Sequence, residues 1–391
     1  MASLKLTSFL EVQEALCNPR LCQSLYEESD ILMKDVLLTL HGKDHRRRRQ
    51  SELKLFTRSA TNDYENKTFS NLLDQMVNQI IEAKDFDLVE FGYLATTQLT
   101  SDFAGVDSED QDIQKLIEIV KRFSEGATIA HSTREKDTVK QNLKIAKDSF
   151  LRFLRPSWDR RKQLILDFNK GHVKEEELPK DVLTILLRNQ DNLKLNDGDI
   201  EREICFYLQA GSHSTVNSLV HAANEILNWT KDTTMLASNP MLVQKCVHES
   251  LRLHPASPVA ARKVIRTTRI AGLLLEEGDE LKLDLASANK DVTVFGEDAD
   301  VFNPLRQIKM KKTQLFGLTF GAGVHHCVGR DLDGGIRVLN QRESHMPQFG
   351  IITRILVRLF GNGMKLHPEK ISKKETHTSR DQWACFPVTI G

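Results

Sequence analysis

The stretch from Phe320 to Gly329, FGAGVHHCVG, decides the fold and the chemistry of this 391-residue chain. It places Cys327 near the end of a loop that contains Gly321 and Gly323. Glycines allow backbone conformations and close approaches that a Cβ atom blocks, so such a loop can lay a sulfur atom against a large planar group. A haem iron with a proximal cysteine needs that arrangement. The alternative is a buried, apolar cysteine in a glycine-rich turn.

The composition argues against several classes of protein. Lysine and arginine together number 54, as do aspartate and glutamate, so the formal net charge is zero, which argues against a nucleic-acid binder. The six cysteines form no CxxC pair, which suits neither a zinc site nor a disulfide framework and fits a reducing compartment. The sequence has no apolar leader and no run of about 18 apolar residues. We therefore expect a cytoplasmic protein without a membrane segment.

A long helix is predicted from Asp199 to Trp229, after the turn signal Asn196-Asp197-Gly198. Its sequence includes AGSHST, from Ala210 to Thr215. The stretch VHESLRLHP, from Val247 to Pro255, follows and carries an ExxR pattern whose acid and base can pair on a helix. FNPLR, from Phe302 to Arg306, comes next, before the cysteine loop.

These four motifs, in this order, resemble those of the cytochromes P450 of the soluble bacterial type. The loop fills every fixed position of the family pattern FGxGxHxCxG. The resemblance covers most of the chain from Leu6 onward. It implies one domain over residues 1–391, mainly α with a small β region and with the haem loop at 320–329. Leu6 to Arg20 is similar to the family's helix B, so we expect the N-terminal part with helix A and the first strands to be truncated.

The resemblance also implies the site residues. Cys327 would be the axial thiolate ligand of haem b. A positively charged group formed by HxxxR (His45 and Arg49) and Arg262 would bind the haem propionates; an ordinary surface cluster is the alternative for HxxxR. The loop residues expected at the cofactor are Phe320, Gly321, His325, Cys327 and Gly329. The expected structural triad beneath the haem is Glu249, Arg252 and Arg306.

The long helix departs from the family pattern AGx(D/E)T, which relays protons to bound dioxygen. Ala210 and Gly211 are retained, but the acid position holds His213 and the first alcohol is Ser214, followed by Thr215. Serine can donate a proton and can bond back to the Ala210 carbonyl. A histidine titrates near neutrality, so His213 could relay protons or contact substrate. Alternatively, it is a polar helix residue that bonds a neighbour or water.

Other stretches give further expectations. Ile129 to Gln141 falls where the family places a mobile lid, and helices are predicted over Asp85 to Leu99 and Asp110 to Phe123. Leu273 to Ala288 predicts a hairpin around Glu277-Gly278-Asp279. Gly334-Gly335 should break the helix that follows Cys327, beside a face made basic by Arg330, Arg337, Lys309, Lys311 and Lys312. An ordinary solvated charged loop is the alternative for these residues.

The resemblance implies a haem-thiolate monooxygenase of secondary metabolism that oxidises a small organic or aromatic substrate with O2. The expected electron donors are a ferredoxin and an NAD(P)H-dependent ferredoxin reductase, because an acidic ferredoxin complements a basic face. The altered His213 and Ser214 pair leaves an alternative, oxidative coupling or peroxide-driven oxidation without oxygen insertion. A non-catalytic haem protein is the third hypothesis.

Overall fold

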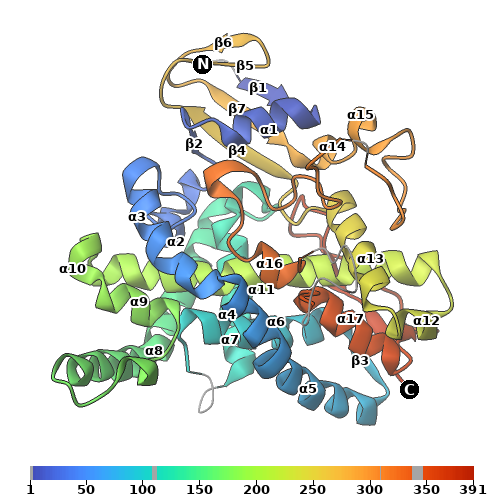
Figure 1. Cartoon of the computed structure of the whole chain (residues 1–391), viewed down its shortest axis with the longest axis horizontal. Helices are drawn as coiled ribbons and strands as arrows, with labels where there is room; N and C mark the ends of the chain where they lie inside the picture. The colour runs from blue at the N-terminus through green and yellow to red at the C-terminus, as the bar shows by residue number, and fades with distance from the viewer. Residues whose placement is uncertain (1–2, 108–111, 309, 337–346) are drawn as a thin grey trace.

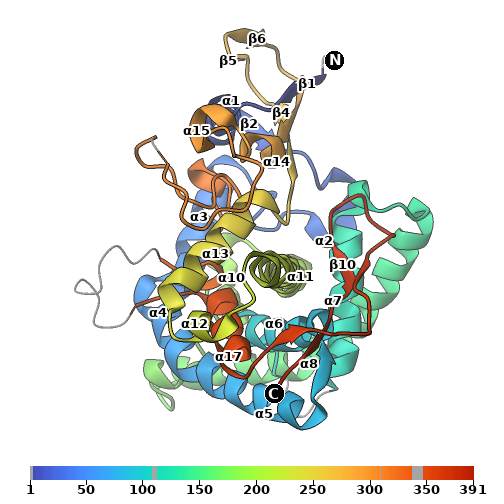
Figure 2. The ribbon, with the colours of Figure 1, turned by 90° about the vertical axis from the view of Figure 1, so that its right-hand side faces the viewer.

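The long helix predicted around AGSHST is the central element of the molecule. A computed structural model describes residues 3–107, 112–308, 310–336 and 347–391 of the chain. The central helix, α11 (Asp197–Trp229), crosses the middle of the molecule, and a small β-sheet lies at one end (Figure 1). Seen end-on, α11 is surrounded by other helices (Figure 2). A capping box fixes its start, because Asn196 Oδ1 accepts a bond from the Asp199 amide and Asp199 Oδ2 accepts one from the Asn196 amide.

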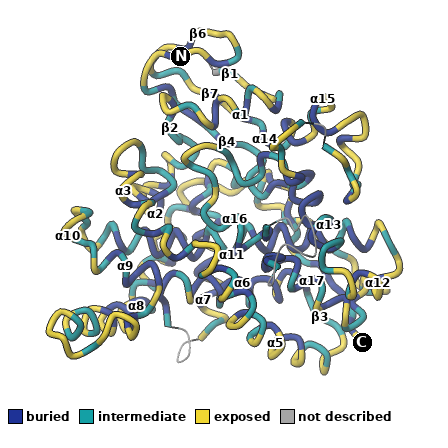
Figure 3. Tube along the Cα trace, in the orientation of Figure 1, coloured by how far each residue is buried: buried dark blue, intermediate teal, exposed yellow. Residues whose placement is uncertain are grey.

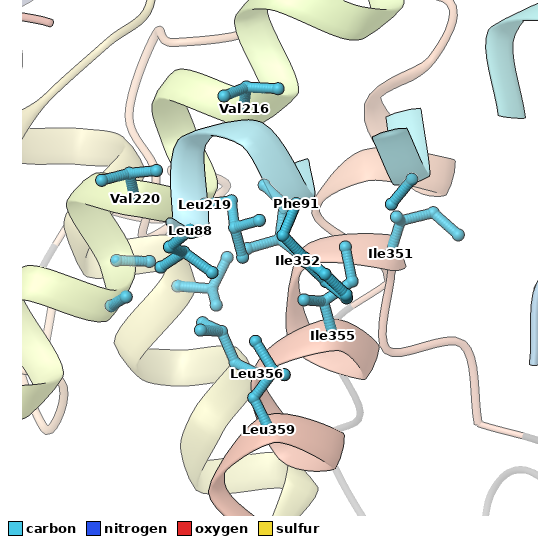
Figure 4. Close-up of a cluster of buried hydrophobic side chains, with 14 of the residues drawn as sticks. Leu88, Phe91, Val216, Leu219, Val220, Ile351, Ile352, Ile355, Leu356 and Leu359 are labelled. Atoms are coloured by element: carbon cyan, nitrogen blue, oxygen red, sulfur yellow. The ribbon is translucent and has the colours of Figure 1, made fainter. Parts of the chain in front are cut away.

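Helix α11 packs most closely against α6 (Leu88–Ala104), and α17 (Ile351–Gly361) completes the core beside them. Figure 4 shows Leu88, Leu219 and Leu356, one from each helix, meeting in this core. All three side chains are fully buried. Burial on this scale is the main stabilising contribution to the position of α11. The peripheral helices are the more exposed ones, as Figure 3 shows for α8 (Lys136–Asn169).

The four-stranded sheet brings the N-terminal strands together with strands from residues 259–284. Strand β1 (Ser3–Leu6) lies parallel to β7 (Glu280–Asp284), which pairs antiparallel with β4 (Val259–Val264). Strand β2 (Leu21–Gln23) forms the other edge. Helix α1 (Phe9–Cys17) packs on this sheet and ends before Asn18, where the Asn-Pro pair stops it. The predicted mainly α fold with a small β region is confirmed.

The predicted hairpin between Leu273 and Ala288 is wrong. Strand β6 (Leu273–Leu275) pairs with β5 (Thr268–Ile270), whereas β7 belongs to the four-stranded sheet. The tight turn is at Ala271 and Gly272, which have φ of 50° and 76°. Two consecutive residues with positive φ match the twist of a hairpin. A turn does form at Glu276–Asp279, closed by the Asp279 amide and the Glu276 carbonyl, but it leads from β6 into a different sheet.

The helix predicted from Asp85 starts later than expected. Asp85–Asp87 forms strand β3, which pairs with β11 (Pro387–Thr389), so the helix predicted from Asp85 begins three residues later. Helix α7 spans Ile113–Ala127, and the start predicted at Asp110 lies outside the described residues. The lid stretch contains a short 3-10 turn at Ile129–His131 and then becomes the first turns of α8.

The helix after Cys327 is broken, as Gly334-Gly335 predicted. Helix α16 spans only Arg330–Asp333, and α17 begins at Ile351. The two ends of the break meet again, because the Ile336 amide donates to the Gln348 carbonyl at 2.9 Å. A Cβ atom on Gly335 would lie 2.3 Å from the Phe349 carbonyl group. We call this contact between residues 335–336 and 348–350 the neck.

Hydrogen bonds from two buried side chains, Gln244 and Glu65, hold the neck together. Gln244 Nε2 donates to the carbonyls of Ile336, Gln348 and Phe349, each at 3.2 Å. The buried Glu65 accepts bonds from the amides of Phe349 and Gly350 at 3.0 and 3.1 Å. A carboxylate at this position also complements the N-terminal end of α17.

The remaining elements complete the arrangement. The other helices are α2 (Asp30–Met33), α3 (Gly42–Glu52), α4 (Arg58–Asp63), α5 (Ser70–Ala83), α9 (Val182–Arg188), α10 (Gln190–Leu193), α12 (Thr233–Ala237), α13 (Pro240–Leu253), α14 (Leu285–Ala288) and α15 (Val292–Phe295). The other strands are β8 (Lys365–Leu366), β9 (Lys373–Lys374) and β10 (Trp383–Cys385). The assignment of residues 1–391 to one domain stays a prediction.

Candidate active site

The loop with Cys327 is closed by its own backbone. The Cys327 amide donates to the Phe320 carbonyl at 2.8 Å, and residues Gly323–His325 form a 3-10 turn. Gly321 and Gly323 both have φ of 69°, a conformation that favours glycine. A Cβ atom on Gly323 would lie 2.9 Å from the Cα atom of Cys17 in α1. The glycines therefore let the loop turn tightly and press against α1.

Cys327 lies in the wall of a cavity of about 340 Å³ and keeps exposed surface there. Burial, and then the nearby Asp333 charge, raise the pKa of the Cys327 thiol to about 11, while the Gly329 amide acts in the opposite direction. The protein alone therefore favours the thiol at neutral pH. A thiolate at this position needs a metal cation, because coordination deprotonates a thiol outright.

Positively charged and histidine side chains gather beside the loop. The rings of His45, on α3, and His325 lie 4.0 Å apart, and their Nε2 atoms are buried without a hydrogen-bond partner among the described residues. Burial and neighbouring cations lower the pKa of His45 to about 4 and that of His325 to about 3. Arg49 and Arg262 line the same cavity. Buried donors without acceptors are costly, and two carboxylates would satisfy them, so these residues fit the propionates of a haem.

Both arginines already have partners. Arg49 Nη2 donates to the His326 carbonyl at 2.8 Å, and Arg262 Nη1 donates to Gln23 Oε1 at 3.0 Å and to the Ala261 carbonyl at 2.9 Å. Arg49 thus connects α3 to the cysteine loop. The roles assigned to His45, Arg49, Arg262, Phe320, Gly321, His325 and Gly329 at the cofactor stay predictions.

Helix α11 forms another wall of the cavity with Ala210, Gly211 and Ser214. Ser214 Oγ donates to the Ala210 carbonyl at 2.5 Å, the back-bond that the sequence predicted. A Cβ atom on Gly211 would lie 2.5 Å from Thr100 Cγ2 on α6. Close packing of α6 therefore explains this glycine by itself. Thr215 donates to Asp333 Oδ1 at 2.7 Å, in the helix that follows Cys327.

His213 is held between two partners that the sequence did not reveal. Its Nδ1 lies 2.8 Å from the Tyr93 hydroxyl, and its Nε2 lies 2.8 Å from Gln382 Nε2. Since the Gln382 amide nitrogen donates to Nε2, Nδ1 carries the proton and the ring is neutral. Burial, and then the charge of Arg380, lower the pKa of His213 to about 3. Its proposed part in a proton relay stays a prediction.

The neutral His213 predicts acid sensitivity. Because its pKa is lowered in the folded protein, only the unfolded chain takes up this proton between about pH 6.5 and pH 3. Its contribution to stability is complete above pH 6.5 and is lost as the pH falls. His213→Gln should reduce the slope of unfolding free energy against pH by up to ~1.4 kcal/mol per unit between pH 6 and 4. Urea unfolding at several pH values measures this slope.

A matched control removes an exposed imidazole. His172 lies on the surface after α8, so His172→Gln should leave the slope as in the wild-type protein. A His213→Gln slope equal to that of the wild-type protein would contradict the neutral, buried assignment.

The predicted Glu249–Arg252–Arg306 triad is assembled beside the cavity. Arg252 Nε and Nη2 donate to the two Glu249 oxygens at 2.8 and 2.6 Å, and Arg306 Nε donates to Glu249 Oε1 at 3.0 Å. The side chains of Glu249 and Arg252 are fully buried and that of Arg306 is 2% exposed. Arg252 also donates to the carbonyls of Asn289 and Ala299. The network ties α13 to the segment that leads to the cysteine loop.

The comparisons with known proteins agree with this geometry. A family model described as Cytochrome P450 matches residues 221–332. Pulcherriminic acid synthase of Bacillus subtilis (strain 168) is 24% identical over 314 residues, which covers 78% of this chain and 73% of the relative. 2-Hydroxy-5-methyl-1-naphthoate 7-hydroxylase of Streptomyces carzinostaticus is 25% identical over 308 residues, or 76% of this chain and 66% of the relative. The structure of P450BioI in complex with an acyl carrier protein ligated to hexadec-9Z-enoic acid has a TM-score of 0.76 and 19% identity, with 99% of this chain and 91% of that chain covered.

These similarities support a cytochrome P450 of the bacterial type. Members of this family are haem-thiolate iron proteins, so the P450 is an oxidoreductase of the haem monooxygenase type. It acts on a small-molecule substrate with O2. None of the helices among the described residues combines the length and hydropathy that a bilayer crossing requires.

Sequence reasoning missed four residues near this site: Tyr93, Asp333, Arg380 and Gln382. Tyr93 and Gln382 are 120 and 169 residues from His213 along the chain. No local pattern could have joined them. Asp333 follows Cys327 by six positions and could have been noticed as an acid next to the motif.

Proposed function

We propose that this P450 oxidises a small organic molecule, either a secondary metabolite or an aromatic compound, by inserting an oxygen atom from O2. The observation that carries the proposal is that one cavity has Cys327 in one wall and Ala210, Gly211 and Ser214 in another. A haem bound through Cys327 would supply the redox chemistry of dioxygen. The naphthoate hydroxylase among the relatives supports an aromatic substrate.

The residues of the chain would bind, orient and move protons. The small side chain of Ala210 would leave room beside the backbone of α11. Ser214 holds a proton at Oγ, currently donated to the Ala210 carbonyl, and rotation of this hydroxyl would direct the proton into the cavity. Leu99, Phe103 and other apolar residues in the wall would exclude water around the substrate.

We propose a ferredoxin as the electron donor, reduced by an NAD(P)H-dependent ferredoxin reductase. Lys311 and Lys312 are exposed, and Arg330 pairs with Asp331 at 2.7 Å. Lys309 and Arg337, which were expected on the same basic face, lie outside the described residues. Positive charge near the cysteine loop would raise the association rate of an acidic partner.

Oxidative coupling, or a peroxide-driven oxidation, is the second candidate function. It is favoured by His213, which replaces the carboxylic acid of the family pattern and is held neutral by Tyr93 and Gln382. A neutral imidazole with both nitrogens engaged is poorly suited to deliver protons, so an oxidation driven by hydrogen peroxide, which brings its own protons, becomes competitive.

Labelled dioxygen separates the two functions. The P450 would be incubated with ¹⁸O2, NADH, ferredoxin and ferredoxin reductase, and the products would be analysed by mass spectrometry. We expect one ¹⁸O atom in each oxidised product. Coupled products without the label, or turnover that requires only peroxide, would contradict oxygen insertion and support the second candidate.

A further inference from the structure

Arg380 places an unpaired positive charge in the wall of the cavity. It lies in the loop between β9 and β10 and is only 7% exposed. Its Nε and Nη2 atoms are buried and have no hydrogen-bond partner among the described residues. A buried guanidinium is charged at any physiological pH, and leaving it without an acceptor is costly.

The backbone holds Arg380 in this position. The Ser379 amide donates to the His131 carbonyl at 2.8 Å, and the Thr133 amide donates to the His377 carbonyl at 3.0 Å. The loop of Arg380 is thus joined to the segment between α7 and α8, over the cavity. The position of the charge does not depend on a side-chain partner.

The charges around the cavity leave Arg380 uncompensated. Among the described residues that line it, Asp333 is the only acidic one, and its carboxylate accepts the Thr215 hydroxyl near Cys327. Arg380 interacts electrostatically with Tyr26, His131 and His213. Burial raises the pKa of Tyr26, while burial and then Arg380 lower the pKa of both histidines, so none of the three is an anion at neutral pH.

The free atoms of Arg380 are the pair that binds a carboxylate side-on. Arg252 in the same chain uses its Nε and Nη2 to hold the two oxygens of Glu249 at 2.8 and 2.6 Å. The planar guanidinium presents these two donors in parallel. Arg49 and Arg262, in contrast, have acceptors and lie with the histidines that fit the haem propionates.

We propose that the substrate carries a carboxylate, which binds Nε and Nη2 of Arg380 and turns the apolar part of the molecule toward Ala210 and Gly211. This inference rests on the proposed function and names the substrate class of that site. The apolar part would contact a wall made of Leu37, Leu38, Phe56, Leu99, Phe103 and Phe206. The buried charge then favours acids over neutral molecules of the same shape.

Pairs of probes that differ only in charge test the proposal. 1-Naphthoic acid would be compared with 1-naphthamide, and dodecanoic acid with dodecanamide, by optical titration of the ferric holoprotein. We expect the wild-type protein to bind at least one acid ~10-fold or more tightly than its amide. Arg380→Met should abolish this preference and leave amide binding within about twofold. Arg266→Met, which removes an exposed arginine, is the control and should keep the preference.

Two readouts do not depend on activity. Haem content should be unchanged in Arg380→Met, and the substrate-free variant should melt at an equal or higher temperature, by up to roughly 2 °C, because a buried unpaired charge is removed. Loss of haem would assign Arg380 to the cofactor, and a lower melting temperature would assign it to the fold. Either result would overturn the proposal.

The remaining outcomes are also decisive. Equal binding of acid and amide by the wild-type protein, or binding of neither acid, would overturn the carboxylate assignment. The proposed function would survive these results if the wild-type protein still incorporated ¹⁸O into a neutral product. Its own failure would appear instead as unlabelled products.

Discussion

Replacing Cys327 with serine should abolish the ferrous–carbonyl absorption band from which the cytochrome P450 family takes its name. The band reports a thiolate opposite carbon monoxide, and a serine hydroxyl remains protonated and binds iron poorly. The loop itself should persist, because its closing bond joins the Cys327 amide to the Phe320 carbonyl. The measurement is the carbon monoxide difference spectrum of the reduced protein, together with haem content.

Cys22→Ser provides the control. Cys22 lies on β2, is partly exposed, and does not line the cavity, so its replacement should leave the band intact. An undiminished band in Cys327→Ser would show that another residue ligates the iron.

Replacing Glu249 with glutamine should cost about 3–5 kcal/mol of unfolding free energy, since it leaves buried charges without their counter-charge. Glu249 accepts bonds from both Arg252 and Arg306, and all three side chains are at most 2% exposed. Glutamine has the same shape but neutralises the acceptor, so the loss would report charge rather than packing. Urea unfolding of the holoprotein measures the change.

Asp298 offers a matched comparison, because it binds the same Arg306. Its Oδ1 accepts from Arg306 Nη1 at 2.6 Å, but its side chain is 51% exposed. Exposed ion pairs contribute little, typically ~0–1 kcal/mol, so Asp298→Asn should have a small effect. Equal losses in the two variants would show that burial does not control the strength of this network.

The sequence predicted those parts of the site that are carried by short stretches of chain. The cysteine loop depends on glycines close to Cys327, and Glu249 and Arg252 are one helical turn apart, so local spacing determines their geometry. The back-bond of Ser214 to Ala210 is likewise a contact within one helix. These features were predictable because helix and turn geometry relates nearby residues directly.

The features that the sequence did not predict depend on contacts between distant segments. Strand β7 reads locally as the partner of β6, but it pairs with β1 and β4 because their apolar faces share a core. The partners of His213 come from α6 and the C-terminal loop. Arg380 belongs to no recognisable sequence motif. Its importance appears only in the structure, where its buried Nε and Nη2 atoms have no hydrogen-bond acceptor among the described residues.

The neck has a consequence for protein engineering. The Ile336 amide nitrogen and the Gln348 carbonyl oxygen lie 2.9 Å apart. The side chains of Gln244 and Glu65, which lie outside the segment between these two residues, bind the neck as well. An insertion between Ile336 and Gln348 would begin and end at neighbouring points that the neck holds in place. Each doubling of the length of this loop would lower the stability by only about 0.6 kcal/mol through the entropy of loop closure. A redox module grafted at this position would be tethered beside the cysteine loop, so that one polypeptide could carry both the donor and the acceptor of electrons.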